Sequence, residues 1–233
     1  MKKVAFLLLL VFSIQSQAQS KSMFGKNPLT NLENWDEQKI YFGFYLGFNS
    51  YGFKTEYKMP QEEIQVDKTT GFNVGLVADL RLSSNLNLRF EPGLYYTQRN
   101  LVFPGFTNTF DTNREVRSTY IHFPLLLKYS AVRTGNVRPY LLGGLSTTLN
   151  LGSNSKSKDD NLQQQFRMKP WSNNYEVGFG IDIYFEYFKF SPSIRGVFGL
   201  KDELIRDNDP NSPWTGNISS MKTRALLINF TFH

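Results

Sequence analysis

The chain has 233 residues, a formal net charge of +6 and a hydrophobic fraction of 40%, a size and composition suited to one large domain. It contains no cysteine, which excludes disulfides, thiolate metal sites and a lipid anchor attached to a cysteine. The basic residues are scattered, and removal of Lys2 and Lys3 with a leader lowers the charge from +6 to +4, so nucleic-acid binding is not indicated.

Residues 1–18 have the parts of a secretory signal peptide. Lys2 and Lys3 form the positive end, an apolar core follows, and Ser-Gln-Ala supplies a small-x-small cleavage site. The apolar core is shorter than the roughly 20 residues that a membrane-spanning helix needs. We therefore predict cleavage before Gln19 and a mature chain that leaves the cytoplasm.

Residues 19–39 form a polar segment between this leader and the first predicted strand. We interpret it as a periplasmic N-terminal arm with Trp35 as its main anchor, and Trp35 and Asp36 as candidate partner-contact residues. The sequence leaves open whether the arm is a disordered tail or docks on the rest of the protein or on a partner. Residues 40–233 form the remaining domain.

The segment 40–49, IYFGFYLGFN, alternates large apolar residues with tyrosine, glycine and asparagine. This period of two predicts a β-strand with a bulky face suited to lipid and a small or polar face suited to a crowded barrel lumen. Similar alternation recurs along the chain. The eight predicted strands are approximately 40–49, 71–82, 86–97, 116–131, 137–150, 174–185, 188–198 and 219–232.

The predicted connections alternate between long and short along the chain. The long ones are approximately 50–70, 100–116, 151–173 and 201–218, and the short ones are 83–85, 132–136 and 186–187. Outer-membrane barrels have short periplasmic turns and longer external loops. We therefore predict an all-β fold, an eight-stranded antiparallel transmembrane β-barrel in the cell outer membrane. Short periplasmic turns, long extracellular loops and periplasmic N- and C-termini follow from this arrangement.

A soluble, lipocalin-like barrel is the main alternative fold. It is disfavoured because the outward rows are phenylalanine and leucine and carry almost no charge. The lipid bilayer is therefore an expected partner. The alternating aromatic residues Phe230 and Phe232 resemble the terminal signal read by outer-membrane insertion machinery, although His233 follows them.

The polar rows of the predicted strands carry a set of charged residues of both signs. These inward residues are Asp79, Arg81, Arg89, Glu91, Lys128, Arg138, Glu176, Asp182, Lys189 and Arg195. Buried charges need partners, and an eight-stranded barrel has an interior only wide enough for side chains. We favour a structural, salt-bridged filling of the lumen over a narrow polar pore. Glu91-Pro92 predicts a local bulge or kink because proline cannot donate to the strand ladder.

Catalytic, metal and cofactor sites are weakly indicated. The only histidines are His122, on an inward row, and His233, the last residue, on the periplasmic side. A hydrogen-bonded structural role for His122 is favoured over a catalytic one. The loop carboxylates, including Asp207 and Asp209, lack the spacing of a calcium-binding loop. We predict no enzyme activity, no metal and no cofactor.

Residues 27–54, NPLTNLENWDEQKIYFGFYLGFNSYGFK, resemble the PorT family, called SprT in gliding bacteria. The segments 71–82, 90–99 (FEPGLYYTQR) and 121–129 are similar to the wider PorT-type barrel family of Bacteroidota. The resemblance implies an accessory role in the type IX secretion system, which exports proteins and delivers gliding adhesins. It also implies other outer-membrane or periplasmic components of that system as partners.

Two other functions stay open. The first is a generic barrel with a structural or adhesive role through its extracellular loops. The second is a lipid-modifying enzyme centred on His122.

Overall fold

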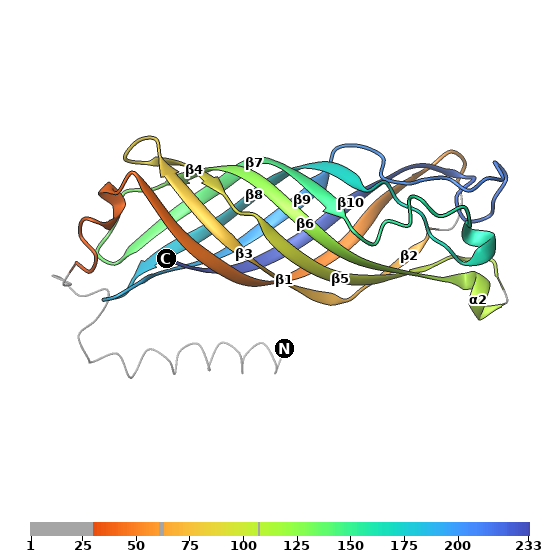
Figure 1. Ribbon diagram of the computed structural model, residues 1–233, viewed down its shortest axis with the longest axis horizontal. Coiled ribbons are helices and arrows are strands. Elements are labelled where there is room, and N and C mark those ends of the chain that lie inside the picture. The colour runs from red at the N-terminus through yellow and green to blue at the C-terminus, as the bar shows by residue number, and fades with distance from the viewer. Residues whose placement is uncertain (1–29, 61–62, 107) are drawn as a thin grey trace, which may run out of the picture.

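The structure, a computed structural model, describes residues 30–60, 63–106 and 108–233. The predicted leader, residues 1–18, lies outside the described residues, as does the arm up to residue 29. The described chain forms an elongated barrel with short segments at its two ends (Figure 1). Its elements are η2 (Trp35–Glu37), β1 (Ile40–Tyr57), β2 (Gln65–Lys68), β3 (Thr70–Arg81), β4 (Leu86–Phe90), β5 (Gly93–Val102), α2 (Thr109–Thr112), β6 (Asn113–Ser130), β7 (Val137–Asn150), η3 (Asn161–Gln163), β8 (Trp171–Tyr184), β9 (Lys189–Gly199) and β10 (Ile218–Phe232).

The strands close into one antiparallel ring. β1 pairs with β10 on one side, in a register that sets Phe44 opposite Phe232, and with β3 on the other. β2 and β3 are two segments of one barrel strand, and β4 and β5 are two segments of the next, since β5 pairs with both β2 and β3. The ten β-segments therefore form eight barrel strands, and the predicted eight-stranded antiparallel barrel is confirmed.

The alternation in β1 separates two environments. Phe42 and Leu46 on the even face are 72% and 50% exposed, whereas Tyr41 and Tyr45 on the odd face are 5% and 0% exposed. Phenylalanine and leucine on an exposed face would be costly in water, but they suit a hydrocarbon layer. The inverted strand predicted at 40–49 is confirmed.

The predicted long loops 50–70 and 100–116 are wrong in extent. β1 continues to Tyr57 and β5 to Val102, so the connections shrink to residues 58–64 and 103–112. Tyr51 and Phe53 carry the inward row onward. The pattern is harder to recognise there because their outward neighbours are polar or glycine, as expected where strands extend beyond the hydrocarbon layer.

A gap in the strand ladder separates β4 from β5 at Glu91-Pro92. β4 ends at Phe90, β5 begins at Gly93, and the amide of Glu91 donates to the carbonyl of Pro124 at 3.3 Å. Glu91 is 2% exposed. The register is the same on both sides of this gap, with Ala78 opposite Phe90 and Gly75 opposite Gly93, so the predicted bulge at Glu91-Pro92 is wrong. Glu91 faces the interior because it belongs to the same inward row as Arg89 and Tyr95.

The three short turns lie at one end of the barrel, together with the arm and the C-terminus (Figure 1). In the β6–β7 turn, Thr134 and Val137 exchange backbone hydrogen bonds, and Gly135 has a φ of +59°. Glycine adopts this left-handed conformation without the steric cost of a side chain. The predicted short turns are confirmed.

The opposite, long-loop end contains an apolar cluster. Residues from the strand ends pack there with residues from the long loops 151–170 and 200–217. Its buried members are Ile64, Leu101, Phe103, Val116, Phe166, Met168, Leu204, Trp214, Ile218 and Met221. In the part of the chain that the structure describes, no helix is long and apolar enough to cross a membrane.

Candidate functional site

Eight of the ten predicted lumen charges are buried inside the barrel. Each is at most 2% exposed, and the set contains four acids and four bases. Equal numbers of opposite charges allow each one to find a partner in a region from which water is excluded. These residues are Asp79, Arg89, Glu91, Lys128, Glu176, Asp182, Lys189 and Arg195.

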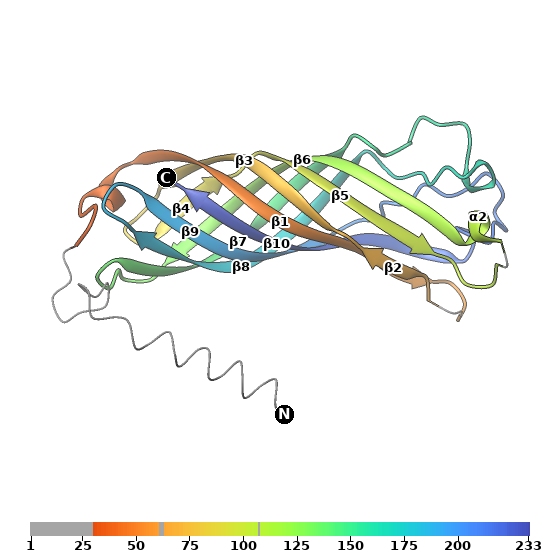
Figure 2. The same cartoon turned by 90° about the horizontal axis from the view of Figure 1, so that it is seen from below.

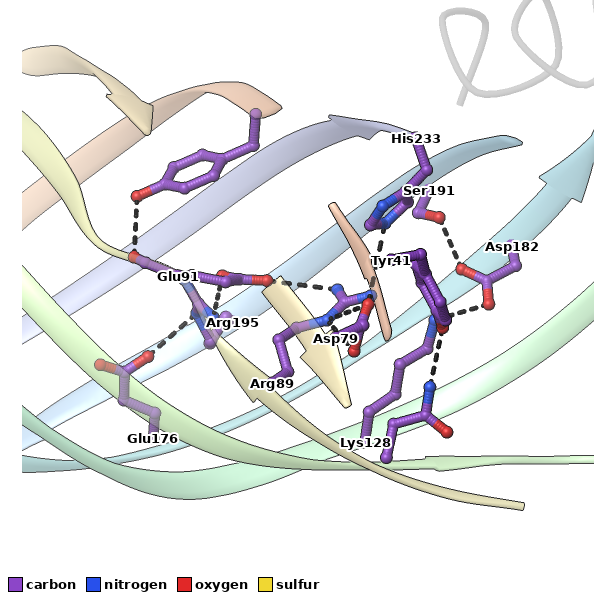
Figure 3. A network of polar contacts seen from close by, with 12 residues as sticks. Tyr41, Asp79, Arg89, Glu91, Lys128, Glu176, Asp182, Ser191, Arg195 and His233 are labelled. Carbon is purple, nitrogen blue, oxygen red and sulfur yellow. Dashed lines mark hydrogen bonds and ion pairs between the residues drawn. The ribbon is translucent and has the colours of Figure 1, made fainter. Parts of the chain in front are cut away.

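Five of these residues form a continuous chain of ion pairs across the lumen (Figure 3). The Nη2 atom of Arg89 lies 2.6 Å from Oδ2 of Asp79, and its Nη1 atom lies 3.2 Å from Oε1 of Glu91. Glu91 Oε2 accepts from Nη1 of Arg195 at 2.7 Å. Arg195 Nε is 3.0 Å from Oε2 of Glu176. Glu91 therefore bridges two guanidinium groups from strands far apart in the sequence.

A second charged group lies nearer the short-turn end. Lys128 donates to Oδ2 of Asp182 at 2.6 Å, and Ser191 donates to Oδ1 of the same carboxylate at 2.5 Å. The ammonium of Lys189 has no hydrogen bond and lies 4.1 Å from the centre of the Tyr41 ring. A cation over an aromatic face is partly stabilised by the ring quadrupole.

His233 folds into this group instead of extending past the strand. Its side chain is fully buried, with Nε2 3.8 Å from Oδ2 of Asp79, and it meets Tyr41 edge to face at 5.2 Å. The terminal residue thus contributes to the filling of the lumen. Phe230 and Phe232, by contrast, stack against outward rings, Phe230 on Phe190 and Phe232 on Phe44. Their insertion role stays a prediction.

Arg81 and Arg138 lie outside the buried set, which corrects their assignment to the lumen network. Arg138 pairs with Asp36 at 3.2 Å, and Arg81 donates to the carbonyl of Glu37 at 3.0 Å. Both arginines lie beside the short turns, where the barrel opens. Sequence alternation shows which residues face inward. It does not show where along a strand the enclosed lumen ends and the open mouth of the barrel begins.

The arm docks on this mouth. Asp36 accepts a hydrogen bond from the Tyr184 hydroxyl at 2.8 Å, and Arg133 donates to the carbonyls of Asn31 and Leu32. Trp35 lies 6.2 Å, centre to centre, from the ring of Tyr41. Residues 31–37 therefore cover the short-turn end through the barrel's own side chains.

His122 lies in the middle of the lumen, fully buried. Its Nδ1 is 2.8 Å from the Thr148 hydroxyl, and its Nε2 is 2.6 Å from Oε1 of Glu176. Asn174 also donates to the Thr148 hydroxyl, at 3.0 Å. Both ring nitrogens have hydrogen-bonding partners, and the imidazole has no exposed surface that a substrate could reach. The arrangement is therefore structural. Within the described ranges, no cluster of acids and histidines could hold a metal ion.

Sequence reasoning missed Arg99, which is fully buried towards the long-loop end. Its guanidinium carbon lies 4.0 Å from the centre of the Phe53 ring, and its Nη2 atom donates to the Tyr120 hydroxyl. Its Nε and Nη1 atoms have no hydrogen-bond partner. The signal was available, because Tyr95 and Arg99 belong to one inward row that runs past the predicted end of the third strand.

The family described as "Outer membrane protein beta-barrel domain" matches residues 16–204. The chain is similar to OprG from Pseudomonas aeruginosa, at 12% identity and a TM-score of 0.48, with 82% of this chain and 92% of that chain covered. It is also similar to Neisserial surface protein A, at 12% identity and a TM-score of 0.44, with coverages of 81% and 95%.

The N-terminal β-barrel domain of Pseudomonas aeruginosa OprF is similar as well, at 16% identity and a TM-score of 0.37, with coverages of 80% and 96%. A search of curated protein sequences gave no significant match.

Proposed function

We propose that this chain, which belongs to the outer membrane protein β-barrel domain family, is an accessory component of the type IX secretion system. The system is named by the resemblance of residues 27–54 to the PorT family. In this role the protein assists export, and gliding adhesin delivery where present, by contacting other components of the outer membrane or periplasm. It performs no catalysis.

The filled lumen is the observation that carries this proposal. Eight buried charges, four of each sign, occupy the interior, the arm docks at the periplasmic mouth, and an apolar cluster lies at the extracellular end. A lumen packed with side chains has no room for a polypeptide in transit. A role in secretion must therefore use the outer surfaces of the barrel.

The arm is the surface that we assign to partner contact. Trp35 and Asp36 anchor it on the barrel, whereas Glu33 and Glu37 are exposed on the docked segment. An anchored segment loses less conformational entropy on binding than a free tail. The acidic side chains are therefore presented to the periplasm in a defined arrangement.

Deletion of the gene tests the proposed system. Export of the system's substrates, measured by quantitative proteomics of the culture medium, should be lost in the deletion strain and restored by the wild-type gene. Normal export in the deletion strain would contradict the proposal.

Charge reversal on the arm tests the proposed surface. Glu33→Lys/Glu37→Lys should reduce both export and the yield of co-purified system components from detergent-solubilised outer membranes. Glu186→Lys is a control for charge reversal at the same end of the barrel, to be compared with each single arm variant, since Glu186 is an exposed acid in the neighbouring β8–β9 turn. Equal recovery of partners with the arm variant and the control would exclude the arm as the contact.

A second candidate function, adhesion through the loops, is favoured by exposed apolar tips. Met59, Phe110 and Leu162 are 67%, 70% and 67% exposed at the long-loop end, on loops held together by the apolar cluster. Exposed apolar side chains on an ordered support are typical of binding surfaces. Trimming loop 151–170, which carries Leu162, should then reduce binding to host or envelope ligands while export continues.

A further inference from the structure

A group of cations lies on the outer surface of the barrel, just to the extracellular side of the band of outward apolar side chains. On β10 the outward row changes from Leu226 and Ile228 to Arg224 and Lys222. On β1 it changes after Phe48, through small residues, to Lys54. The strands β1 and β10 run side by side (Figure 2). The change from apolar to cationic marks the height at which the wall leaves the hydrocarbon layer.

Two of these cations face each other directly. Lys54 and Lys222 are register partners on β1 and β10, and one step lower Gly52 is paired with Arg224. Like charges directly opposite in a sheet are destabilising, so this pair weakens the unliganded barrel. Glu56 offsets one charge, with its carboxylate 3.2 Å from Lys54, but it also accepts from the Ser220 hydroxyl at 2.8 Å.

A third and a fourth cation complete the group. The outward side of Gly52 is covered by Lys68, whose Cε and Nζ atoms would be 2.4 and 3.1 Å from a Cβ placed there. Arg224 lies over the Phe198 ring at 5.2 Å, and Phe198 stacks on Tyr175 at 4.9 Å. The four cations thus lie around Gly52, at the extracellular border of the outward aromatic residues.

The same level of the wall is different on β7 and β8. There the outward residues are Thr147 and Asn173, which bond to each other at 3.1 Å. These neutral groups make a border that needs no charged ligand. The cationic group on β1, β2 and β10 therefore has no counterpart at this level of β7 and β8.

We propose that Lys54, Lys68, Lys222 and Arg224 bind the phosphate groups of an anionic glycolipid in the outer leaflet. The site lies at the extracellular end, at headgroup height, on a surface that faces lipid. Phosphate placed between Lys54 and Lys222 removes their repulsion, and the planar guanidinium of Arg224 can donate to phosphate bidentately. The acyl chains of the same lipid would lie against the outward apolar residues below, including Phe48 and Ile228.

Binding of diphosphoryl lipid A tests this inference. The purified full chain is placed in phosphatidylcholine nanodiscs doped with diphosphoryl lipid A, and bound lipid is measured by native mass spectrometry. Lys54→Gln/Lys222→Gln should weaken affinity by about 30-fold, since each cation near an anionic surface contributes about a fivefold factor. Lys54→Arg/Lys222→Arg should retain wild-type affinity, and dephosphorylated lipid A should bind no better than phosphatidylcholine.

The control removes two cations from a loop. Lys156 and Lys158 are exposed in loop 151–170, and Lys156→Gln/Lys158→Gln should bind lipid A as the wild type does. In nanodiscs without lipid A, Lys54→Gln/Lys222→Gln should unfold at the same temperature as the wild type or a higher one. Wild-type affinity in that variant, equal loss in the loop control, or a lower unfolding temperature in neutral lipid would each overturn the inference.

Discussion

Buried charges are stabilised in different ways in the two halves of the lumen. Towards the periplasmic end, bases and acids alternate along chains of ion pairs such as Asp79–Arg89–Glu91. Towards the extracellular end, no carboxylate of the described residues lies within ion-pair distance of Arg99, which lies among the rings of Tyr51, Phe53 and Tyr120. The stability of the ion-pair chains depends on the presence of every partner. The stability of Arg99 in its site depends mainly on its contact area with the rings.

This difference predicts different responses to substitution. Removing one member of a buried pair leaves the other uncompensated, which is destabilising by about 3–5 kcal/mol. Removing an apolar group from the loop cluster leaves a cavity whose walls belong partly to loops that can relax. We therefore expect the periplasmic half to control global stability and the extracellular half to control local order.

The largest effect is expected at Glu91. Glu91→Gln removes the charge that bridges Arg89 and Arg195, and should lower the free energy of unfolding by about 3–5 kcal/mol. Urea unfolding in detergent micelles, followed by tryptophan fluorescence, measures the loss. Glu186→Gln, in an exposed turn, should leave stability unchanged. A wild-type urea midpoint for Glu91→Gln would show that the ion pairs do not hold the barrel.

A smaller, local effect is expected at Leu204. This residue is 1% exposed in the apolar cluster, and Leu204→Ala should destabilise the loop end by about 2–3 kcal/mol. Hydrogen exchange in loops 151–170 and 200–217 should accelerate while exchange in the lower parts of β6 to β9 stays slow. Uniform acceleration along the strands would mean that the two halves unfold as one unit.

Arg99 distinguishes the two ways of burying charge most directly. Arg99→Met keeps much of the contact with Phe53 and leaves no buried acid in an ion pair without its partner, so the free energy of unfolding, measured with urea, should change by about 1 kcal/mol or less. Arg195→Met is the contrasting variant because it leaves both Glu91 and Glu176 short of a partner. Equal losses in the two variants would contradict the distinction.

The periplasmic half could be predicted from sequence more completely than the extracellular half. Within the membrane, each strand must alternate lipid-facing and lumen-facing residues, so the inward row that includes Asp79 and the one that includes Glu176 are visible as a pattern of period two. Above the membrane the outward row becomes polar or glycine while the inward row carries apolar residues such as Leu101, so the pattern of large apolar residues outside and polar residues inside no longer holds. The continuation of β1 past residue 49 and the position of Arg99 were missed for that reason.

Contacts between distant segments were beyond the reach of the sequence. Residues as far apart as Asp36 and Arg138, or Lys54 and Lys222, meet only because the ring closes in one register. A shift of one residue would turn every side chain to the other face. The alternation shows which face a residue occupies, but only the register shows its neighbours.

The smallest effect is a pH dependence at the loop end. Burial raises the pKa of the Glu203 carboxyl, which accepts from the Thr223 amide at 3.0 Å and from its hydroxyl at 2.8 Å. A pKa that is higher in the folded state than in the unfolded state means that the protonated form stabilises folding. This stabilisation is complete below the unfolded pKa, about 4.5, and is lost as the pH rises through the folded pKa.

Hydrogen exchange in loop 200–217 should therefore become faster, relative to the intrinsic rate, as the pH rises from below 4.5 to neutrality. Glu203→Gln should remove this dependence and slow exchange at neutral pH, because the amide oxygen can still accept from Thr223 without a buried charge. If the variant keeps the wild-type pH dependence, another group controls the loop. If its exchange at neutral pH is faster than that of the wild type, the ionised carboxylate stabilises the extracellular half, and that half would also depend on charge.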